Sequence, residues 1–237
     1  MDEPLPETGA IEHEHPDVTG GWLRPAVFGA MDGLVSNFAL IMGVTGGSDD
    51  TKPVLIAGLA GLAAGAFSMA AGEYTSVASQ SELALAQIEI ERLEIIRNGA
   101  AEEAELAAMY VEKGVEEHTA REVAAQIHRD VDNAVDVHAR EEFGVDSNDL
   151  ASPMLAAVSS FVAFALGALV PLIPLLIGIE SPWPTVVLSL AALFACGAVV
   201  TNLTTRSWWF GGTRQLLLGG VAAGLTYLIG EVVGTAV

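Results

Sequence analysis

Long stretches without charge dominate the hydrophobic pattern of this chain. Such stretches could be buried helices of a soluble protein, but five of them in a chain of 237 residues favour a membrane protein. A helix that crosses a bilayer needs about 20 apolar residues, and five stretches meet that requirement. They lie near residues 25–46, 54–79, 153–177, 183–204 and 214–235. The sequence therefore predicts an all-α integral membrane protein with five transmembrane helices.

The segment between the second and third spans, residues 82–149, has a different pattern. The second span has no further proline for about 45 residues after Pro53, so we expect one helix of about 67 Å that leaves the membrane. We expect Asn98-Gly99 to end this helix and residues 101–113 to form the next. A capping box that begins at Thr119 is expected to open a third helix. The sequence thus predicts a cytoplasmic three-helix insert between helices two and three.

The positions of the arginines predict the orientation. With five spans, the amino terminus, the insert and an expected loop at 206–214 lie on one side of the membrane. That side carries Arg24, Arg206 and Arg214, whereas the other side carries Lys52 alone. Positively charged short loops face the cytoplasm. We therefore expect four segments: an acidic tail (1–24), helices one and two (25–81), a cytoplasmic insert (82–149) and helices three to five (150–237).

Composition narrows the possible partners. Charged residues make up 17% of the chain, and the net charge is −20. Such a charge would repel nucleic-acid phosphates, so we expect no nucleic-acid partner. The single cysteine, Cys196, excludes an intrachain disulfide. A short chain rich in Ala, Gly and Val, without a visible targeting signal, favours a prokaryotic plasma membrane, with a vacuolar membrane as the alternative.

The insert holds 18 of the 30 acidic residues, and some of them form pairs on one helix face. A solvated acidic face is the usual explanation of such runs. His138 continues an apolar stripe, however, so we expect its side chain to point toward the other helices as a core residue or as a metal ligand. If the helices pack, three pairs converge on a metal site: Glu91 and Glu94, Glu102 and Glu105, and His138 and Glu142.

Polar residues inside the spans carry further chemistry. A lone carboxylate such as Asp32 is costly in a membrane, so it is either functional or a protonated acid held by Ser36 or Asn37. Met69 and Glu73 lie one helical turn apart near the cytoplasmic end of the second span. Met69 alone would be ordinary packing. A thioether beside carboxylates, however, favours a transition metal over Mg²⁺ or Ca²⁺.

Two stretches that contain these residues resemble the signature of the vacuolar iron transporter family. The first runs from Ala30 to Asn37, and the second runs from Ser68 to Glu82. The resemblance implies five spans with a cytoplasmic insert, and a homodimer with its pore between the two copies of the first span. It also implies export of Fe²⁺, and often Mn²⁺, from the cytoplasm in exchange for protons, without a permanent cofactor. In this chain Asp32 and Met69 would line the pore, and Glu73 would lie at its cytoplasmic entrance.

The same resemblance implies that the insert binds metal. Two pairs match the family's ExxE pattern, Glu91 with Glu94 and Glu102 with Glu105. Glu142 matches the last acidic position, but the methionine that precedes it by four residues in the family is replaced here by His138. Imidazole binds Fe²⁺ and Zn²⁺ well, so we expect the site to persist with an altered metal preference. Zn²⁺ and Co²⁺ therefore join Fe²⁺ and Mn²⁺ as candidate ions.

A secondary transporter is the leading hypothesis, with metal ions, protons, the bilayer and a second copy of the chain as partners. A membrane-anchored metal sensor or an iron-binding, iron-oxidising protein is the alternative. A ferritin-type oxidase would need an ExxH motif, which is absent at His118, His128 and His138. A sensor would need the insert but not Asp32 and Met69. The sequence therefore predicts a transporter and not an enzyme.

Overall fold

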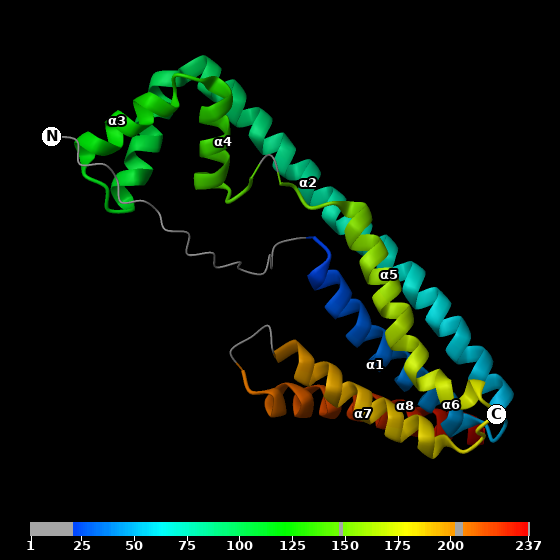
Figure 1. The fold of residues 1–237 in the computed structure, drawn as a ribbon. Coiled ribbons are helices and arrows are strands. Elements are labelled where there is room, and N and C mark those ends of the chain that lie inside the picture. Colours follow the sequence, from blue (N-terminus) through cyan, green and yellow to red (C-terminus); the bar gives the residue numbers. More distant parts are fainter. Residues whose placement is uncertain (1–20, 147–148, 202–205, 237) are drawn as a thin grey trace.

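The computed structural model describes residues 21–146, 149–201 and 206–236, and the regular elements in these ranges are all helical. Most of the acidic tail and the predicted end of the fourth span lie outside the described residues. Five helices are long and apolar enough to cross a membrane, which confirms the predicted fold class. In chain order the elements (Figure 1) are α1 (Leu23–Gly47), α2 (Thr51–Glu112), α3 (Glu117–Ile127), α4 (Val131–Glu142), α5 (Pro153–Leu169), the 3₁₀ turn η1 (Val170–Leu172), α6 (Ile173–Leu176), α7 (Pro182–Val200) and α8 (Trp208–Ala236).

Helix α2 joins the membrane part to the insert. It has 62 residues, and a straight helix of that length would be about 93 Å long. The predicted stop at Asn98-Gly99 is wrong, because the chain only kinks at Asn98 (φ −129°, ψ 31°) and stays helical to Glu112. A buried face that includes Ile95 and Leu106 continues across the kink and packs against α3 and α4. This packing offsets the low helix propensity of the Asn-Gly pair.

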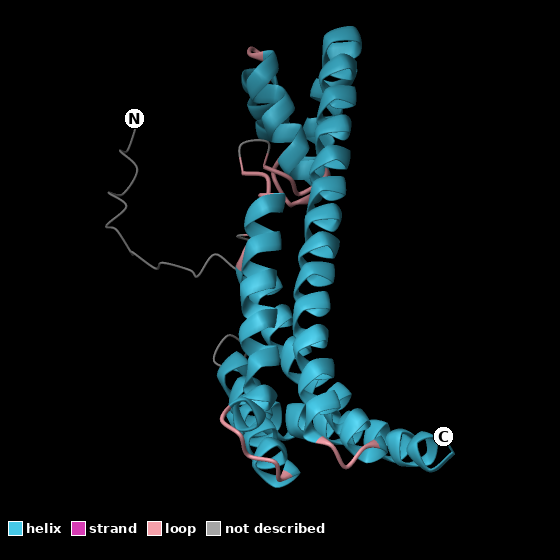
Figure 2. Cartoon of the chain, turned by 90° about the vertical axis from the view of Figure 1, so that its right-hand side faces the viewer, coloured by secondary structure: helices cyan, strands magenta, loops and turns pink. Residues whose placement is uncertain are grey.

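The predicted third helix of the insert is also two helices. The capping box at Thr119 is wrong, because α3 begins earlier, at Glu117. Residues 128–130 then interrupt the helix, and the side chain of Asp130 accepts a hydrogen bond from the backbone N–H of Asn133 to cap α4. The insert is therefore formed by the outer half of α2 together with α3 and α4. Figure 2 shows this all-helical arrangement from the side.

Helix α1 is central to the membrane part, where it packs most extensively against α5 and α8. Glycines allow these helices to approach closely: a Cβ added at Gly33 would overlap the backbone of Phe164 in α5. The expected loop at 206–214 is mostly wrong, since α8 begins at Trp208. Trp208, Trp209 and Phe194 of α7 form a ring cluster there, which favours an ordered helical start over a loop.

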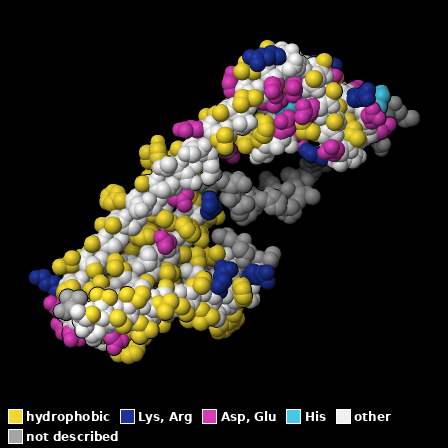
Figure 3. Space-filling view, turned by 180° about the vertical axis from the view of Figure 1, so that it is seen from behind, with side chains coloured by type: hydrophobic (Ala, Val, Ile, Leu, Met, Phe, Trp, Pro, Cys, Tyr) yellow, Lys and Arg dark blue, Asp and Glu magenta, His cyan; other side chains and the backbone are white. Residues whose placement is uncertain are grey.

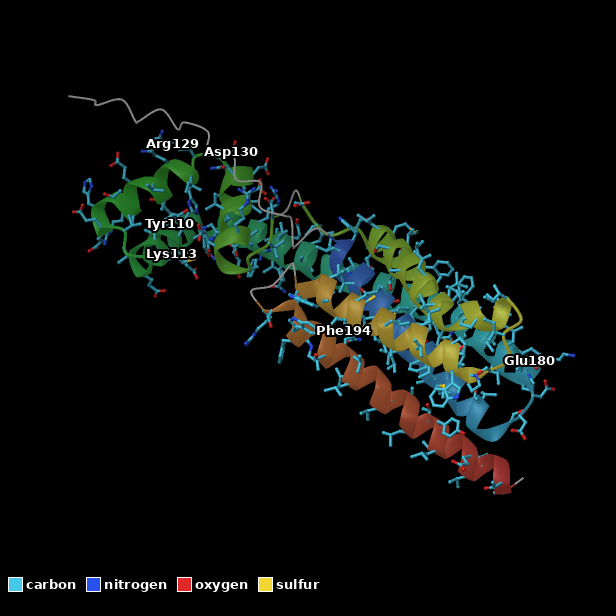
Figure 4. The ribbon with its side chains drawn as sticks, turned by 60° about the horizontal axis from the view of Figure 1, so that its bottom comes forward. Tyr110, Lys113, Arg129, Asp130, Glu180 and Phe194 are labelled. Carbon is cyan, nitrogen blue, oxygen red and sulfur yellow. The ribbon has the colours of Figure 1, made fainter. Side chains whose placement is uncertain are left out.

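The two ends of the membrane part differ. The start of α1 lies at the end nearest the insert, whereas the α1–α2 turn and the end of α8 lie at the far end (Figure 1). The labelled Glu180, in the loop before α7, is far from the labelled Arg129 and Asp130 at the α3–α4 turn (Figure 4). On the face seen in Figure 3, acidic side chains gather over the insert and apolar side chains over the spans.

Candidate metal pathway and metal centre

A groove of about 430 Å³ lies between α1 and α2 in the membrane part. The three residues that the sequence suggested for a pore, Asp32, Met69 and Glu73, all line this groove. Asp32 comes from α1, and the other two come from successive turns of α2. The groove therefore brings one thioether and two carboxylates into a single space between the apolar, membrane-spanning parts of α1 and α2.

Glycines on α2 explain why this groove exists. Gly61 and Gly65 meet side chains of α1 and α5 so closely that a Cβ at either position would overlap Leu40 or Phe164. Gly72 has no atom within 4 Å of the place where a Cβ would stand. Helix α2 is thus in contact with α1 near Gly61 and with α5 near Gly65, and it leaves open space farther along, toward Gly72.

Asn37 adds an oxygen that no hydrogen bond satisfies. Its amide nitrogen donates to the carbonyl oxygen of Ala168 at 2.6 Å, and its side-chain oxygen is buried without a partner. Ser36 donates to the backbone carbonyl of Asp32 at 2.5 Å and not to the carboxylate. In the described part of the chain, the hydrogen bonds of Ser36 and Asn37 thus do not support the alternative in which they hold a protonated Asp32. Asn37 also lines the groove, so its free oxygen is a candidate ligand.

The insert collects a second set of donors around Glu91. Nδ1 of His138 lies 3.0 Å from Oε1 of Glu91 and 2.7 Å from Oε1 of Glu142. Donor atoms of Glu91, Glu94 and Glu102 also lie within 4.8 Å of one another. Glu91 is therefore shared by two three-residue groups. The structure brings five of the six predicted insert residues together.

The sixth predicted residue, Glu105, is exposed and belongs to neither group among the described residues. Its charge still acts on Glu102, whose pKa is raised by burial and then by repulsion from Glu105. Glu105 is exposed because of the helical register of α2, which turns its side chain away from the buried face. In the outer half of α2 the buried face includes Ile88, Glu91, Ile95, Glu102 and Leu106. Because α2 continues past Asn98, both ExxE pairs lie on one kinked helix, contrary to the predicted break.

Electrostatics at Glu91 suit a site that holds either a proton or a metal ion. Burial, followed by repulsion from Glu142, raises the pKa of Glu91 to about 7. His138 acts in the opposite direction but does not outweigh these two effects. Clustered carboxylate oxygens match the preferences of Mn²⁺ and Fe²⁺. A divalent cation would replace the proton and relieve the repulsion among the acids.

Sequence reasoning missed several polar residues. Ser68 and Ser76 line the groove on the same face of α2 as Met69 and Glu73, and their near-helical spacing could have indicated this. In the sequence, His128 stands out only as a histidine that lacks a glutamate three residues before it. Its Nε2 is buried without a hydrogen-bond partner, as is Nε2 of His138. Leaving such a group unpaired costs about 1–3 kcal/mol, and no simple spacing signal marks it.

The sequence is similar to those of known proteins over nearly its whole length. The sequence model of the VIT family matches residues 23–231. The "Vacuolar iron transporter" of Acanthamoeba castellanii is 36% identical over 95% of this chain and 84% of its own length. "Vacuolar iron transporter 1" of Arabidopsis thaliana is 28% identical over 98% of this chain and 94% of its own length. "Vacuolar iron transporter homolog 2" of Oryza sativa subsp. japonica is 36% identical over 88% of each chain.

Proposed function

Because this chain belongs to the VIT family, we propose that it is an iron transporter that carries Fe²⁺ through the α1–α2 groove. The family consists of transporters and not enzymes, so the iron-oxidising alternative is set aside. Mn²⁺, Zn²⁺ and Co²⁺ are further candidate substrates, because the same donor types bind them. We also propose export from the cytoplasm, with the insert on the cytoplasmic side, in a prokaryotic plasma membrane, although the relatives are named for the vacuole.

One observation carries the proposal: Asp32, Met69 and Glu73 line the same groove. A charged side chain within a membrane costs several kcal/mol and is rare outside functional sites. A thioether adds affinity for a transition metal over Ca²⁺ and Mg²⁺. The free oxygen of Asn37 supports a path in which the ion exchanges water for protein oxygens.

Proton exchange follows from the chemistry of Asp32. A carboxylate binds either a proton or a metal ion, so metal binding releases the proton. In the proposed cycle, Fe²⁺ enters past Glu73, displaces the proton at Asp32 and leaves toward the α1–α2 turn. A proton then returns to Asp32 from the far side.

A second copy of the chain would complete this path. Asp32 and Glu73 are only partly buried, and Ser36 and Ser76 are exposed along the same groove. Lipid could not satisfy these groups, whereas a second α1 could supply matching polar side chains. We therefore propose a homodimer with the two grooves facing each other.

The insert would supply ions to this path. Glu73 and Glu91 lie on the same helix, 18 residues or about 27 Å apart. The cluster around Glu91 would raise the local concentration of divalent metal next to the cytoplasmic entrance. A metal sensor would use the same cluster, but it would not need the groove.

Flux measurements with the full-length protein in liposomes would test the proposal. A dye for Fe²⁺ and a dye for pH are enclosed together, and Fe²⁺ is compared with Mn²⁺, Zn²⁺, Co²⁺ and Ca²⁺. We expect Fe²⁺ entry with simultaneous proton exit, faster under an imposed proton gradient and absent with Ca²⁺. Metal binding without flux would favour the sensor, and flux without proton movement would contradict the exchange.

A further inference from the structure

Two histidines of the insert lie ring against ring. His128 follows α3, and His138 lies in α4 with no exposed surface. Their ring centroids are 5.2 Å apart, and the ring planes meet at 84°. Neither the pore nor the carboxylate cluster around Glu91 includes His128.

The hydrogen bonds of these rings fix where their protons are. Nδ1 of His128 lies 3.0 Å from the carbonyl oxygen of Ala124, and a carbonyl can only accept, so Nδ1 carries the proton. Nδ1 of His138 faces the carboxylate of Glu142 at 2.7 Å and likewise donates. In the neutral form of each ring, the lone pair is therefore on Nε2.

Both Nε2 atoms are buried and have no hydrogen-bond partner. Histidines that bind metal commonly donate their other ring N–H to a carboxylate or to a backbone carbonyl. His138 has the first kind of support and His128 has the second. From these facts we infer that His128 and His138 form a second metal site, in which both bind one transition-metal ion through Nε2.

Edge-to-face packing of the two rings would explain their angle but not the two unpaired nitrogens. The proposed site also differs from the carboxylate cluster. His138 only donates its Nδ1–H to Glu142 in that cluster, whose ligands are then carboxylate oxygens, and it offers Nε2 on its other edge. Two imidazoles favour Cu²⁺ or Zn²⁺, whereas carboxylates favour Mn²⁺. The insert would thus have one oxygen-rich site and one nitrogen-rich site, and this inference does not depend on transport.

Pulsed electron paramagnetic resonance with Cu²⁺ tests the inference, because the remote ring nitrogens report how many imidazoles bind. The full-length protein is used with His13→Ala and His15→Ala, so that the tail histidines do not contribute. We expect two imidazoles in this background and one after His128→Phe, which keeps the aromatic contact. His118→Phe, at an exposed position, is the matched control and should retain two. Two imidazoles after His128→Phe, or fewer than two in the background, would overturn the inference.

Affinities measured by calorimetry separate a ligand from a structural residue. For the nitrogen site, His128→Phe should weaken Zn²⁺ binding at least tenfold and leave Mn²⁺ binding at the carboxylates unchanged. If the affinities for both ions fall together, His128 only supports the fold of the insert, and the proposed site is wrong.

Discussion

Replacing Glu91 by glutamine should change how the stability of the insert depends on pH. Glu91 is 4% exposed, and burial followed by repulsion from Glu142 raises its pKa from 4.5 to about 7. Between these two values the folded protein binds more protons than the unfolded chain, so the free energy of unfolding falls as the pH rises. The full shift corresponds to at most about 3 kcal/mol, and screening at the more exposed Glu142 reduces the expected loss to about 2 kcal/mol.

Hydrogen exchange read by mass spectrometry can measure this loss locally, on peptides from α4 and the outer half of α2. Chelator is present, and exchange is corrected for the intrinsic effect of pH. In the wild type, protection should fall by about 2 kcal/mol between pH 4.5 and pH 8. In Glu91→Gln the fall should be clearly smaller, because no charge develops at position 91 and Glu102 is the remaining buried acid of this cluster whose pKa is raised. Glu89→Gln, at an exposed position on the same helix, is the control and should behave like the wild type. Equal pH dependence in Glu91→Gln and the wild type would refute the reasoning.

Further predictions concern packing, selectivity and the insert. Gly33→Ala should lower the stability of the membrane part by about 1–3 kcal/mol, because its Cβ would overlap α5. Gly99→Ala, with open space around it, should be neutral or slightly stabilising. Thermal unfolding followed by circular dichroism checks both variants. Met69→Leu keeps the volume but loses the sulfur, so liposome flux should show slower Fe²⁺ transport or a smaller preference for Fe²⁺ over Ca²⁺; an unchanged ratio would mean that the thioether is packing. The double substitution Glu102→Ala and Glu105→Ala should weaken divalent-metal binding on the order of tenfold or more in calorimetry, and equal affinity would exclude this pair from the site.

The spans were predictable because one physical requirement, enough apolar length to cross a bilayer, decides them. The helix boundaries of the insert were less predictable, because tertiary packing outweighs two local sequence signals there. The Asn98-Gly99 pair does not end α2, since the buried face on both sides of it packs against α3 and α4. Thr119 does not cap a helix, because α3 begins before it and Asp130 caps the next one. Tertiary packing decides such boundaries, and a single sequence does not contain it.

The residues of the candidate site also differ in how far the sequence predicts them. Asp32 was evident because an acid stands out in an apolar span, and the buried position of His138 followed from an apolar stripe. His128 was missed because its importance lies in an unpaired nitrogen near another ring, which depends on the turn between α3 and α4. From the sequence alone, Asn37 is a possible support for Asp32. Its side-chain oxygen is free because its amide nitrogen donates a hydrogen bond to Ala168 of α5, and such a tertiary contact leaves no pattern in the sequence.

The role of Asp32 is the central claim, and Fe²⁺ flux by Asp32→Asn tests it most directly. The variant and the wild type are reconstituted at equal protein density, with a proton gradient imposed and a pH dye inside. Asparagine keeps the size and some hydrogen bonding but loses the exchangeable charge. Asp49→Asn, at an exposed position in the α1–α2 turn, is the matched control. We predict that Asp32→Asn abolishes both Fe²⁺ and proton movement while metal binding by the insert persists, and that Asp49→Asn transports normally. Transport by Asp32→Asn at the wild-type rate would mean that Asp32 is a structural acid and that the exchange mechanism is wrong.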